Sequence, residues 1–329
     1  KFSSLPSEEV SLRPSTLFDR HLMAIRTTNR GKSTSSLSIL DKLIKNDKKL
    51  LIIDPTGEYF NSFNENDNIT KLNLGIDTIL DTGRLSFSQW ATLFETNDST
   101  QPAVLADAIK SLRYQKKIGS NDVNQKSGKT LIKVSQDMSS LNIRDTSFDM
   151  SLLSRQIAEE AVEISRDMKT YIAGSFQFNQ KQWLMQKVEY KISNTRLSDF
   201  FSLETKTKTD LIKKIDSFLK NDIRNLYINT STIGTSDSIG GMIVELISTY
   251  IIDSKKKDDF GFVMFIDEAH RYSQNNQENN YQIGLTSIAR EGRKKGIFLF
   301  LTTQNPQDVP KELLGQIGTL LIHRLTHKN

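Results

Sequence analysis

The sequence predicts an α/β fold with a mainly parallel sheet, interrupted by a large, mostly helical insertion. Two observations predict it. Short apolar runs bounded by charged or turn residues recur along the chain, which is typical of buried parallel strands. Segments with helical spacing of apolar residues separate these runs, and strands that alternate with helices favour a doubly wound sheet. The 329 residues are enough for one large domain or two ordinary ones.

The first crossover unit lies near the N-terminus. Apolar runs at 21–25 and 49–54 are the strand signals, and residues 33–46 between them carry leucine and isoleucine at helical spacing. The order strand, loop, helix, strand is one βαβ unit. Residues 1–20 are polar and contain Pro6 and Pro14, so we expect a linker or the remnant of an upstream element there.

The sequence divides into a core and an insertion. We expect residues 21–85 and 222–329 to form the core and residues 86–221 to form the insertion. In the second part of the core, strand signals fall at 225–229, 261–267, 297–301 and 319–323, and helix signals at 238–252 and 281–294. The insertion has periodic stretches such as 151–168 and 209–219, and its middle, 114–150, is rich in Lys, Ser, Asn and Asp and is expected to be irregular.

Composition excludes several classes of function. The chain has no cysteine, which excludes disulfides, thiolate catalysis and cysteine-ligated zinc, and is compatible with a cytoplasmic protein. No apolar run approaches the roughly 18 residues that a membrane span needs. The net charge of +5 weakly favours a polyanionic partner, although such an excess also serves solubility.

A phosphate-binding loop is predicted directly after the first strand. Gly31, Lys32 and Ser33 supply the last three positions of the pattern G-x-x-x-x-G-K-[ST], in which backbone N–H groups cradle phosphates, the lysine reaches the terminal phosphates and the hydroxyl binds Mg²⁺. Arg26 stands where the first glycine is expected, and Asn29 where a further glycine is common. The alternative is a lysine-bearing turn before a helix. The candidate nucleotide-binding residues are Thr27, Thr28, Asn29, Arg30, Gly31, Lys32, Ser33 and Thr34.

A second segment imitates this pattern. Residues 126–130, Lys-Ser-Gly-Lys-Thr, end like a phosphate loop, but no apolar strand precedes them and Val123 occupies the place of the first glycine. We therefore reject this segment as a nucleotide site.

A pair of carboxylates follows the strand 261–267. Five apolar residues, 262–266, deliver Asp267 to the strand tip, where its charge can hold Mg²⁺. Glu268 can orient or deprotonate an attacking water. We expect this strand to be adjacent to the phosphate-loop strand. The alternative is an ordinary buried strand with a polar end.

Further polar residues occur around the strand 297–301. Gln304 follows that strand, so we expect its amide at the sheet edge beside the γ-phosphate. Arg290 and Arg293 precede it and are candidates for an arginine finger that acts on a neighbouring subunit's site, with a solvated helix end as the alternative. The four histidines, His21, His270, His323 and His327, form no convincing metal site, and we expect structural or surface roles for them.

The order of motifs resembles the HerA-type hexameric ATPases of the HerA/FtsK superfamily, over about 21–60 and 223–326. The resemblance implies a RecA-like core, a homo-hexameric ring, ATP and Mg²⁺ bound between subunits, and translocation on double-stranded DNA. The residues that carry it are His21–Ile25, Asp54-Pro-Thr-Gly-Glu-Tyr59, Asp267-Glu-Ala-His270, Ala289-Arg-Glu-Gly-Arg-Lys294, Thr303-Gln-Asn-Pro306 and 308–316.

The resemblance also implies a partner subunit, and it leaves three hypotheses. The first is a DNA motor that works with a partner nuclease of the NurA type in end resection. The second is an ATPase-fold scaffold that regulates an effector, such as a sirtuin-like NADase or a nuclease in anti-phage defence, with little translocation. The third class, the coupling ATPases of conjugation and secretion, shares the core but would normally bring membrane segments or different motif contexts.

Overall fold

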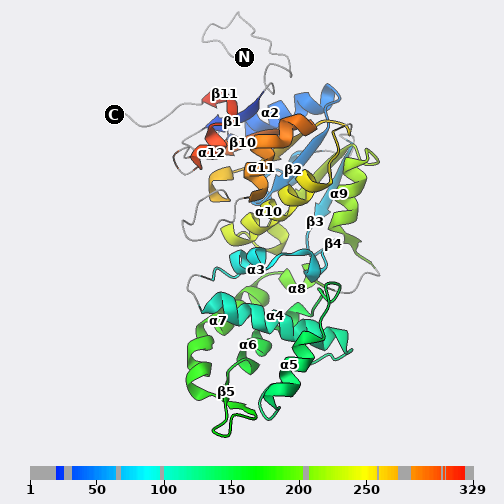
Figure 1. The fold of residues 1–329 in the computed structure, drawn as a ribbon. Helices are drawn as coiled ribbons and strands as arrows, with labels where there is room; N and C mark the ends of the chain where they lie inside the picture. Colours follow the sequence, from blue (N-terminus) through cyan, green and yellow to red (C-terminus); the bar gives the residue numbers. More distant parts are fainter. Residues whose placement is uncertain are drawn as a thin grey trace, which may run out of the picture. The chain divides into compact units, whose positions relative to one another are not determined.

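The computed structural model describes residues 20–25, 32–63, 68–96, 100–202, 207–257, 259–272, 283–304, 307 and 309–322. The chain forms two compact units, which Figure 1 shows with their helices and strands labelled. The first unit consists of Lys1–Leu72, Ile215–Asn229 and Ile243–Asn329, and the second of Asn73–Lys214 and Thr230–Met242.

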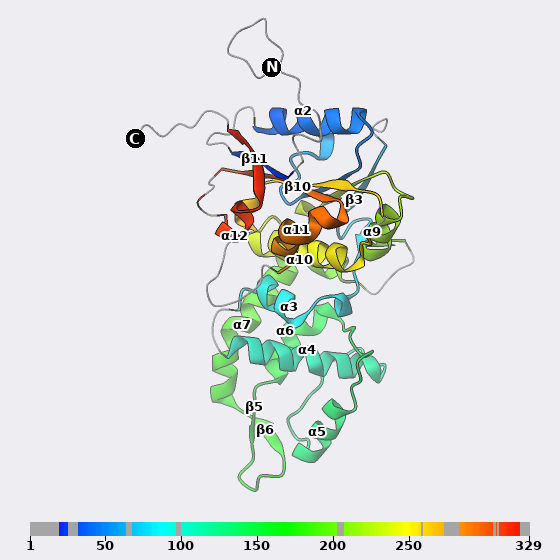
Figure 2. The ribbon, with the colours of Figure 1, turned by 45° about the horizontal axis from the view of Figure 1, so that its top comes forward.

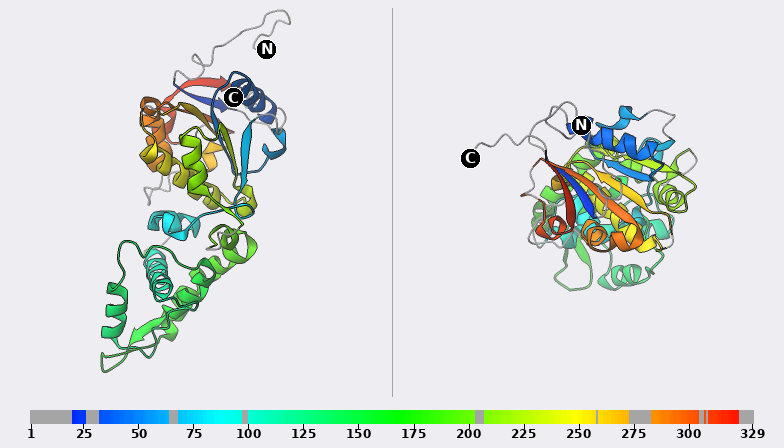
Figure 3. Two further views of the ribbon diagram at one scale, coloured as in Figure 1. Left: turned by 90° about the vertical axis from the view of Figure 1, so that its right-hand side faces the viewer. Right: turned by 90° about the horizontal axis from the view of Figure 1, so that it is seen from above.

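A seven-stranded sheet forms the centre of the first unit, in the order β11-β1-β10-β9-β2-β8-β3. Every pairing from β11 to β8 is parallel, and the right-hand view of Figure 3 shows β11, β1 and β10 side by side. The predicted parallel α/β sheet is therefore confirmed. The strands are β1 (His21–Ile25), β2 (Leu50–Asp54), β3 (Ile69–Asn73), β8 (Asn225–Asn229), β9 (Phe262–Ile266), β10 (Ile297–Thr303) and β11 (Ile317–Ile322).

Helices cover both faces of this sheet. Helix α2 (Lys32–Lys45) lies on one face, and α10 (Asp237–Ser254) and α11 (Ile283–Glu291) lie on the other, as Figure 2 shows. All five residues of β1, β2, β8 and β9 are buried, because a parallel strand between two helical layers has no solvated side. Leu40 and Leu43 of α2 pack on one set of alternating strand residues, which includes Leu22 and Ile52.

The segment after β2 is organised by one buried carboxylate. Asp54 accepts hydrogen bonds from the backbone N–H groups of Thr56 (3.0 Å), Gly57 (2.8 Å) and Tyr59 (2.8 Å), and from the hydroxyl of Thr56 (2.9 Å). The hydroxyl of Tyr227, on the neighbouring strand β8, donates a fifth bond of 2.5 Å. Gly57 has a φ of 76°, a conformation that glycine adopts without strain. The Asp54–Tyr59 motif is therefore a turn whose backbone N–H groups surround the Asp54 carboxylate.

The second unit is mostly helical. Its aromatic core is built around Trp90, whose ring lies 5.3 Å from that of Phe148 and 5.0 Å from that of Phe201. The helices of this unit are α3 (Phe87–Leu93), α4 (Gln101–Lys117), α5 (Leu131–Ser139), α6 (Leu153–Glu159), α7 (Ser175–Asn194) and α8 (Leu197–Phe200). Helix α9 (Leu211–Leu219) leads back to the first unit, whose last helix is α12 (Lys311–Leu314).

Two expectations for the insertion held only in part. The stretch 114–150 is irregular over 118–130 and 140–149, as expected, but it contains α5, which Thr130 caps by accepting a hydrogen bond from the backbone N–H of Lys133. The periodic stretch 151–168 is helical only as far as Glu159, and it continues into an antiparallel hairpin of β5 (Val162–Ile164) and β6 (Tyr171–Ala173). A short β-ladder between β4 (Thr78–Ile79) and β7 (Thr209–Asp210) was also not expected.

Residues 126–130, rejected above as a phosphate loop, support this hairpin. The backbone N–H of Gly128 donates to Tyr171 (2.8 Å), and Lys126 is buried in an ion pair with Glu160. The ammonium group of Lys126 is thus held inside the second unit, in agreement with the rejection.

Removing the Asp54 carboxylate should strongly destabilise the first unit. Asp54→Ala leaves the buried Tyr227 hydroxyl and three backbone donors without their acceptor, which we expect to lower the free energy of unfolding by at least about 3 kcal/mol. Asp41→Ala is the control, because Asp41 forms only an exposed pair with Lys45 (2.7 Å) and its loss should cost less than about 0.5 kcal/mol. Urea unfolding measures both, and equal effects would contradict the role given to Asp54.

Candidate active site

Four neighbouring strands of the central sheet end at one level. Pairing of Ala24 with Thr302, of Leu301 with Ile266 and of Ile53 with Ile266 aligns the C-terminal ends of β1, β10, β9 and β2. Ligands of open α/β sheets bind beyond the carboxyl ends of the strands. The candidate site therefore lies at this edge, where residues 26–31 leave β1 and Asp267 follows β9.

The two motif strands are not neighbours, and the expectation that they would be adjacent was wrong. Strand β10 lies between β1 and β9 and pairs in parallel with both. This arrangement places Thr302, Thr303 and Gln304, at the end of β10, between the phosphate-loop strand and the carboxylates. The amide predicted beside the γ-phosphate position thus comes from the strand that separates the two motifs.

One threonine orders both carboxylate residues. The hydroxyl of Thr302 donates to Oδ1 of Asp267, and the same hydroxyl oxygen accepts the backbone N–H of Glu268 at 3.0 Å. Asp267 and Thr302 are almost fully buried. Thr302 was not predicted as a site residue, although its place directly after the apolar run 297–301 was the available signal.

Glu268 is held in an unusual backbone conformation. Its φ of 51° and ψ of 46° lie in the left-handed region, which is uncommon for a residue other than glycine. Its Oε1 accepts a hydrogen bond from Nε2 of Gln304, and its Oε2 lies 3.4 Å from Nδ1 of His270. Nδ1 of His270 also lies 3.2 Å from the hydroxyl of Thr303. The structure therefore brings together Glu268 and Gln304, two of the candidate catalytic residues, and adds His270 and Thr303 to them.

The donor set suits Mg²⁺. A buried carboxylate at a strand end is the kind of oxygen ligand that Mg²⁺ takes, and this ion keeps most of its remaining positions for water and phosphate oxygens. Asp267 supplies that carboxylate. Within the described part of the chain, no three His, Asp or Glu residues form a metal cluster, so any ion here would depend on oxygens beyond the protein's carboxylates.

The phosphate-loop candidates fall largely outside the described residues. Thr27, Thr28, Asn29, Arg30 and Gly31 lie outside them, and so does Arg26. Lys32, Ser33 and Thr34 form the first turn of α2, a helix of 14 residues. The backbone N–H groups of a helix N-terminus attract anions, which is the property that the predicted phosphate loop requires of α2.

Within the described ranges, no ion pair or hydrogen bond joins the two arginine candidates to the carboxylates of their own chain. Arg290 is in the last turn of α11, Arg293 is in the 3₁₀ helix Gly292–Lys295 that follows, and both are exposed. Among the described residues, neither arginine contacts Asp267 or Glu268.

Helix α11 is anchored at its start and at its end. At the start, the backbone N–H of Gly284 donates to both carboxylate oxygens of Glu245, at 3.1 and 3.0 Å. A Cβ at Gly284 would lie 2.9 Å from the backbone of α10, so glycine permits this close approach. At the end, the His21 ring binds the carbonyl of Ala289, the residue before Arg290, at 2.9 Å.

His21 is a three-way junction that the sequence did not reveal. Its Nδ1 accepts the backbone N–H of Leu299 on β10 at 2.9 Å, so its Nε2 carries the proton and donates to Ala289 on α11. The residue itself begins β1, the phosphate-loop strand. Burial lowers the pKa of His21, which keeps the ring neutral. This role fits the structural assignment expected for the histidines; His323 and His327 lie outside the described residues.

The sheet order and the strand-end carboxylates define a RecA-like P-loop α/β fold, and solved structures share it. The plasmid coupling protein TrwB in complex with ADP and Mg²⁺ matches with a TM-score of 0.54 at 16% identity, over 94% of this chain and 70% of that one. VirB4 of Thermoanaerobacter pseudethanolicus matches with a TM-score of 0.55 at 12% identity, over 92% and 76%. At such identities the likeness concerns the fold alone.

The family follows from the sequence comparisons. The family described as "Helicase HerA, central domain" matches residues 3–253, and "Helicase HerA-like C-terminal" matches residues 244–327. The chain belongs to the HerA helicase family.

Relatives in this family are longer than the chain. The DNA double-strand break repair helicase HerA of Sulfolobus acidocaldarius is 26% identical over 326 residues, which are 96% of this chain and 57% of that protein. The probable helicase MJ1565 of Methanocaldococcus jannaschii is 24% identical over 330 residues, which are 96% of this chain and 55% of that protein. The chain thus spans little more than half the length of these relatives.

The neutral His21 should make stability depend on pH. Because its folded-state pKa lies below the unfolded value of about 6.5, the unfolded chain binds more protons as pH falls through that value. The free energy of unfolding should therefore be highest above about pH 6.5 and fall below it, by at most about 1.4 kcal/mol per pH unit, levelling off below the folded-state pKa. His21→Gln, which keeps a donor and an acceptor but does not titrate, should flatten this dependence in urea unfolding between pH 5 and 8. Equal slopes in both proteins would exclude His21 as the source of the pH dependence.

Proposed function

We propose that this protein is a Mg²⁺-dependent ATPase that works as a ring-shaped motor on double-stranded DNA. The observation that carries the proposal is the common level at which β1, β10 and β9 end. It gathers Asp267, Glu268 and Gln304 at the sheet edge from which the segment 26–34 departs. Membership of the HerA family supports the DNA substrate, and the relative from Sulfolobus acidocaldarius is a DNA double-strand break repair helicase by name.

Each residue at the edge has a proposed part. Lys32 and the backbone N–H groups of 27–34 hold the phosphates, and Ser33 and Asp267 hold Mg²⁺, which neutralises phosphate charge when bound. Glu268 takes the proton of the attacking water, and the Gln304 amide, which already donates to the Glu268 carboxylate, orients that carboxylate and the water. That a TrwB structure contains ADP and Mg²⁺ supports the choice of ligands.

The ring is part of the proposal. The exposure of Arg290 and Arg293, neither of which is joined to Asp267 or Glu268 in the described part of the chain, favours an arginine that acts on the neighbouring subunit. Completion of the site between subunits makes a homo-hexamer the active form. A partner nuclease of the NurA type, or a sirtuin-like effector, completes the proposed assembly. No membrane is part of it, in line with the finding that no described helix is long and apolar enough to cross one.

Two substitutions test the site. Lys32→Ala should abolish ATP binding or turnover, because it removes the phosphate-binding charge. Glu268→Gln should keep ATP binding and lower kcat by about 10²–10⁴-fold, because it removes the general base. Phosphate release with and without duplex DNA measures turnover, and DNA-independent turnover would favour the scaffold hypothesis. Wild-type rates in both variants would show that the site is misassigned.

Mixed rings test the arginine. Arg290→Ala should lower turnover by about 10³-fold or more if Arg290 stabilises the transition state of the adjacent site. Rings that mix Arg290→Ala with Glu268→Gln subunits should recover part of the activity. At some of their interfaces, an intact Glu268 of one subunit meets an intact Arg290 of its neighbour. Arg293→Ala, measured in the same way, shows which of the two candidate arginines acts on the adjacent site. Full activity of the Arg290→Ala ring, or no recovery in verified mixed rings, would remove the trans role from Arg290.

Binding to DNA should be electrostatic. Lysine and arginine side chains that neutralise phosphates release counterions, so the affinity for duplex DNA should be independent of sequence and fall steeply with salt. Fluorescence anisotropy with two unrelated duplexes of equal length, between 50 and 300 mM salt, measures this. An affinity that stays constant over that range would argue against DNA as the substrate.

A further inference from the structure

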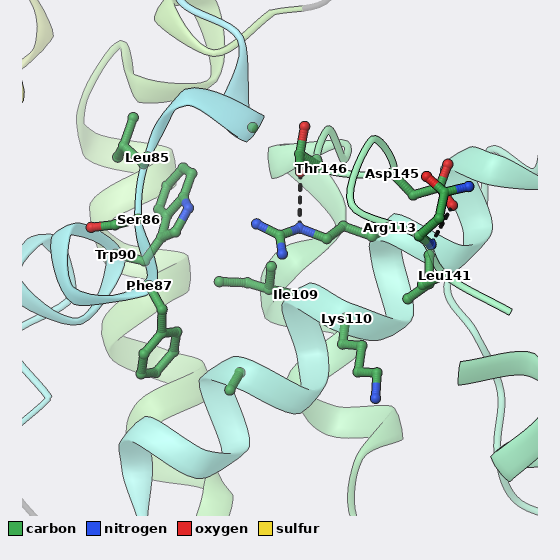
Figure 4. A pocket seen from close by; sticks show the side chains of 13 residues that line it. Leu85, Ser86, Phe87, Trp90, Ile109, Lys110, Arg113, Leu141, Asp145 and Thr146 are labelled. Atoms are coloured by element: carbon green, nitrogen blue, oxygen red, sulfur yellow. Dashed lines mark hydrogen bonds between the residues drawn. The ribbon is translucent and has the colours of Figure 1, made fainter. Parts of the chain in front are cut away.

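The second unit contains a cleft that has no part in the proposed ATPase site. It encloses about 520 Å³, within the roughly 300–1,000 Å³ typical of small-molecule sites. Figure 4 shows the side chains that line it. They come from 83–90, from α4 and from the segment 141–146, all within Asn73–Lys214.

A cationic side chain without a counter-charge faces this cleft. Nε of Arg113 donates to the carbonyl of Thr146 at 2.9 Å, and this is the hydrogen bond that fixes the guanidinium. In the described part of the chain, no carboxylate pairs with it, and burial lowers the pKa of Arg113. A half-buried guanidinium whose remaining N–H groups point into a cleft is costly unless an anion meets them.

The carboxylate that lines the cleft is occupied elsewhere. Asp145 forms an ion pair with Lys117 at 3.1 Å and accepts the backbone N–H of Asn142 at 2.9 Å. Lys110 is exposed on the same face of α4 as Arg113 and adds a second positive charge to the lining. The balance of charge in the cleft is therefore positive.

An indole ring lies on the other side of the cleft from the guanidinium. Trp90 is fully buried, and Figure 4 shows its indole nitrogen on the side of the ring that faces Arg113. Contacts with Phe148 and Phe201 hold the ring in place. Because Trp90 belongs to the lining, its emission can report on what binds in the cleft.

We propose that this cleft binds a small organic anion whose carboxylate or phosphate group lies against Arg113. The group would accept hydrogen bonds from the guanidinium, and charge-assisted bonds of this kind are the stronger ones in proteins. The apolar body of the ligand would pack on Leu85, Phe87 and Leu141, which line the same cleft. This site is independent of the proposed ATPase function, because it uses none of the residues of the candidate active site.

Tryptophan fluorescence of the full chain tests the proposal. The chain has two tryptophans, and Trp183, which is 65% exposed, can be replaced so that Trp183→Phe leaves Trp90 as the single reporter. The probes are cyclohexyl phosphate and cyclohexanecarboxylate, which do not absorb at the excitation wavelength, with cyclohexanol as the neutral control. We expect a saturable change in Trp90 emission with at least one anion and none with cyclohexanol; the two anions distinguish a phosphate site from a carboxylate site.

Substitution of Arg113 connects the binding to the guanidinium. In the same background, Arg113→Met keeps much of the apolar stem and should weaken binding by about tenfold or more, whereas Arg113→Lys should restore part of it. The proposal would be overturned if neither anion changed Trp90 emission at up to 10 mM. Equal affinities with methionine and arginine at position 113 would also overturn it. If Arg113→Met does not fold, preference for the anions over cyclohexanol decides the question alone.

Discussion

The parallel pairing of β1, β10, β9 and β2 is the constraint on which the candidate site depends. It brings the ends of strands that lie up to 278 positions apart in sequence to one level, and the polar residues that follow each strand then share one edge. Both faces of these strands are buried, so the register depends on how their side chains fit against the helices on each face, and a shift of one residue would exchange the two sets of side chains. The position of Asp267 is thus determined by packing over the whole sheet.

Two buried polar groups carry this order from the sheet to its connections. Asp54 ties the turn after β2 to the neighbouring strand β8 through the Tyr227 hydroxyl. His21 ties β1 to β10 and to the end of α11, beside Arg290. Both are fully buried and fully engaged, and such satisfied polar groups specify one arrangement of their surroundings. A movement of α11 would therefore displace His21, the first residue of β1.

Local patterns predicted the strands, the helices that cover them and the pair Asp267 and Glu268, since hydrophobic periodicity and a polar residue after an apolar run are short-range signals. The position of β10 between β1 and β9 was not predicted, because strand order is set by long-range packing. The His21 junction and the cleft at Arg113 escaped for a related reason. Their partners, at 289 and 299 for His21 and at 146 for Arg113, meet only in the folded chain. The hairpin after α6 was missed because its strands are three residues long, too short for an alternating pattern to show.

The left-handed backbone at Glu268 has an evolutionary consequence. A non-glycine residue in this region costs about 1–3 kcal/mol, and glycine would relieve much of that strain. Selection for folding alone would therefore favour glycine over glutamate at position 268. A library sorted only for thermal resistance should accumulate glycine there. Under the proposed function, the same torsion sets thermal resistance against turnover at this single position.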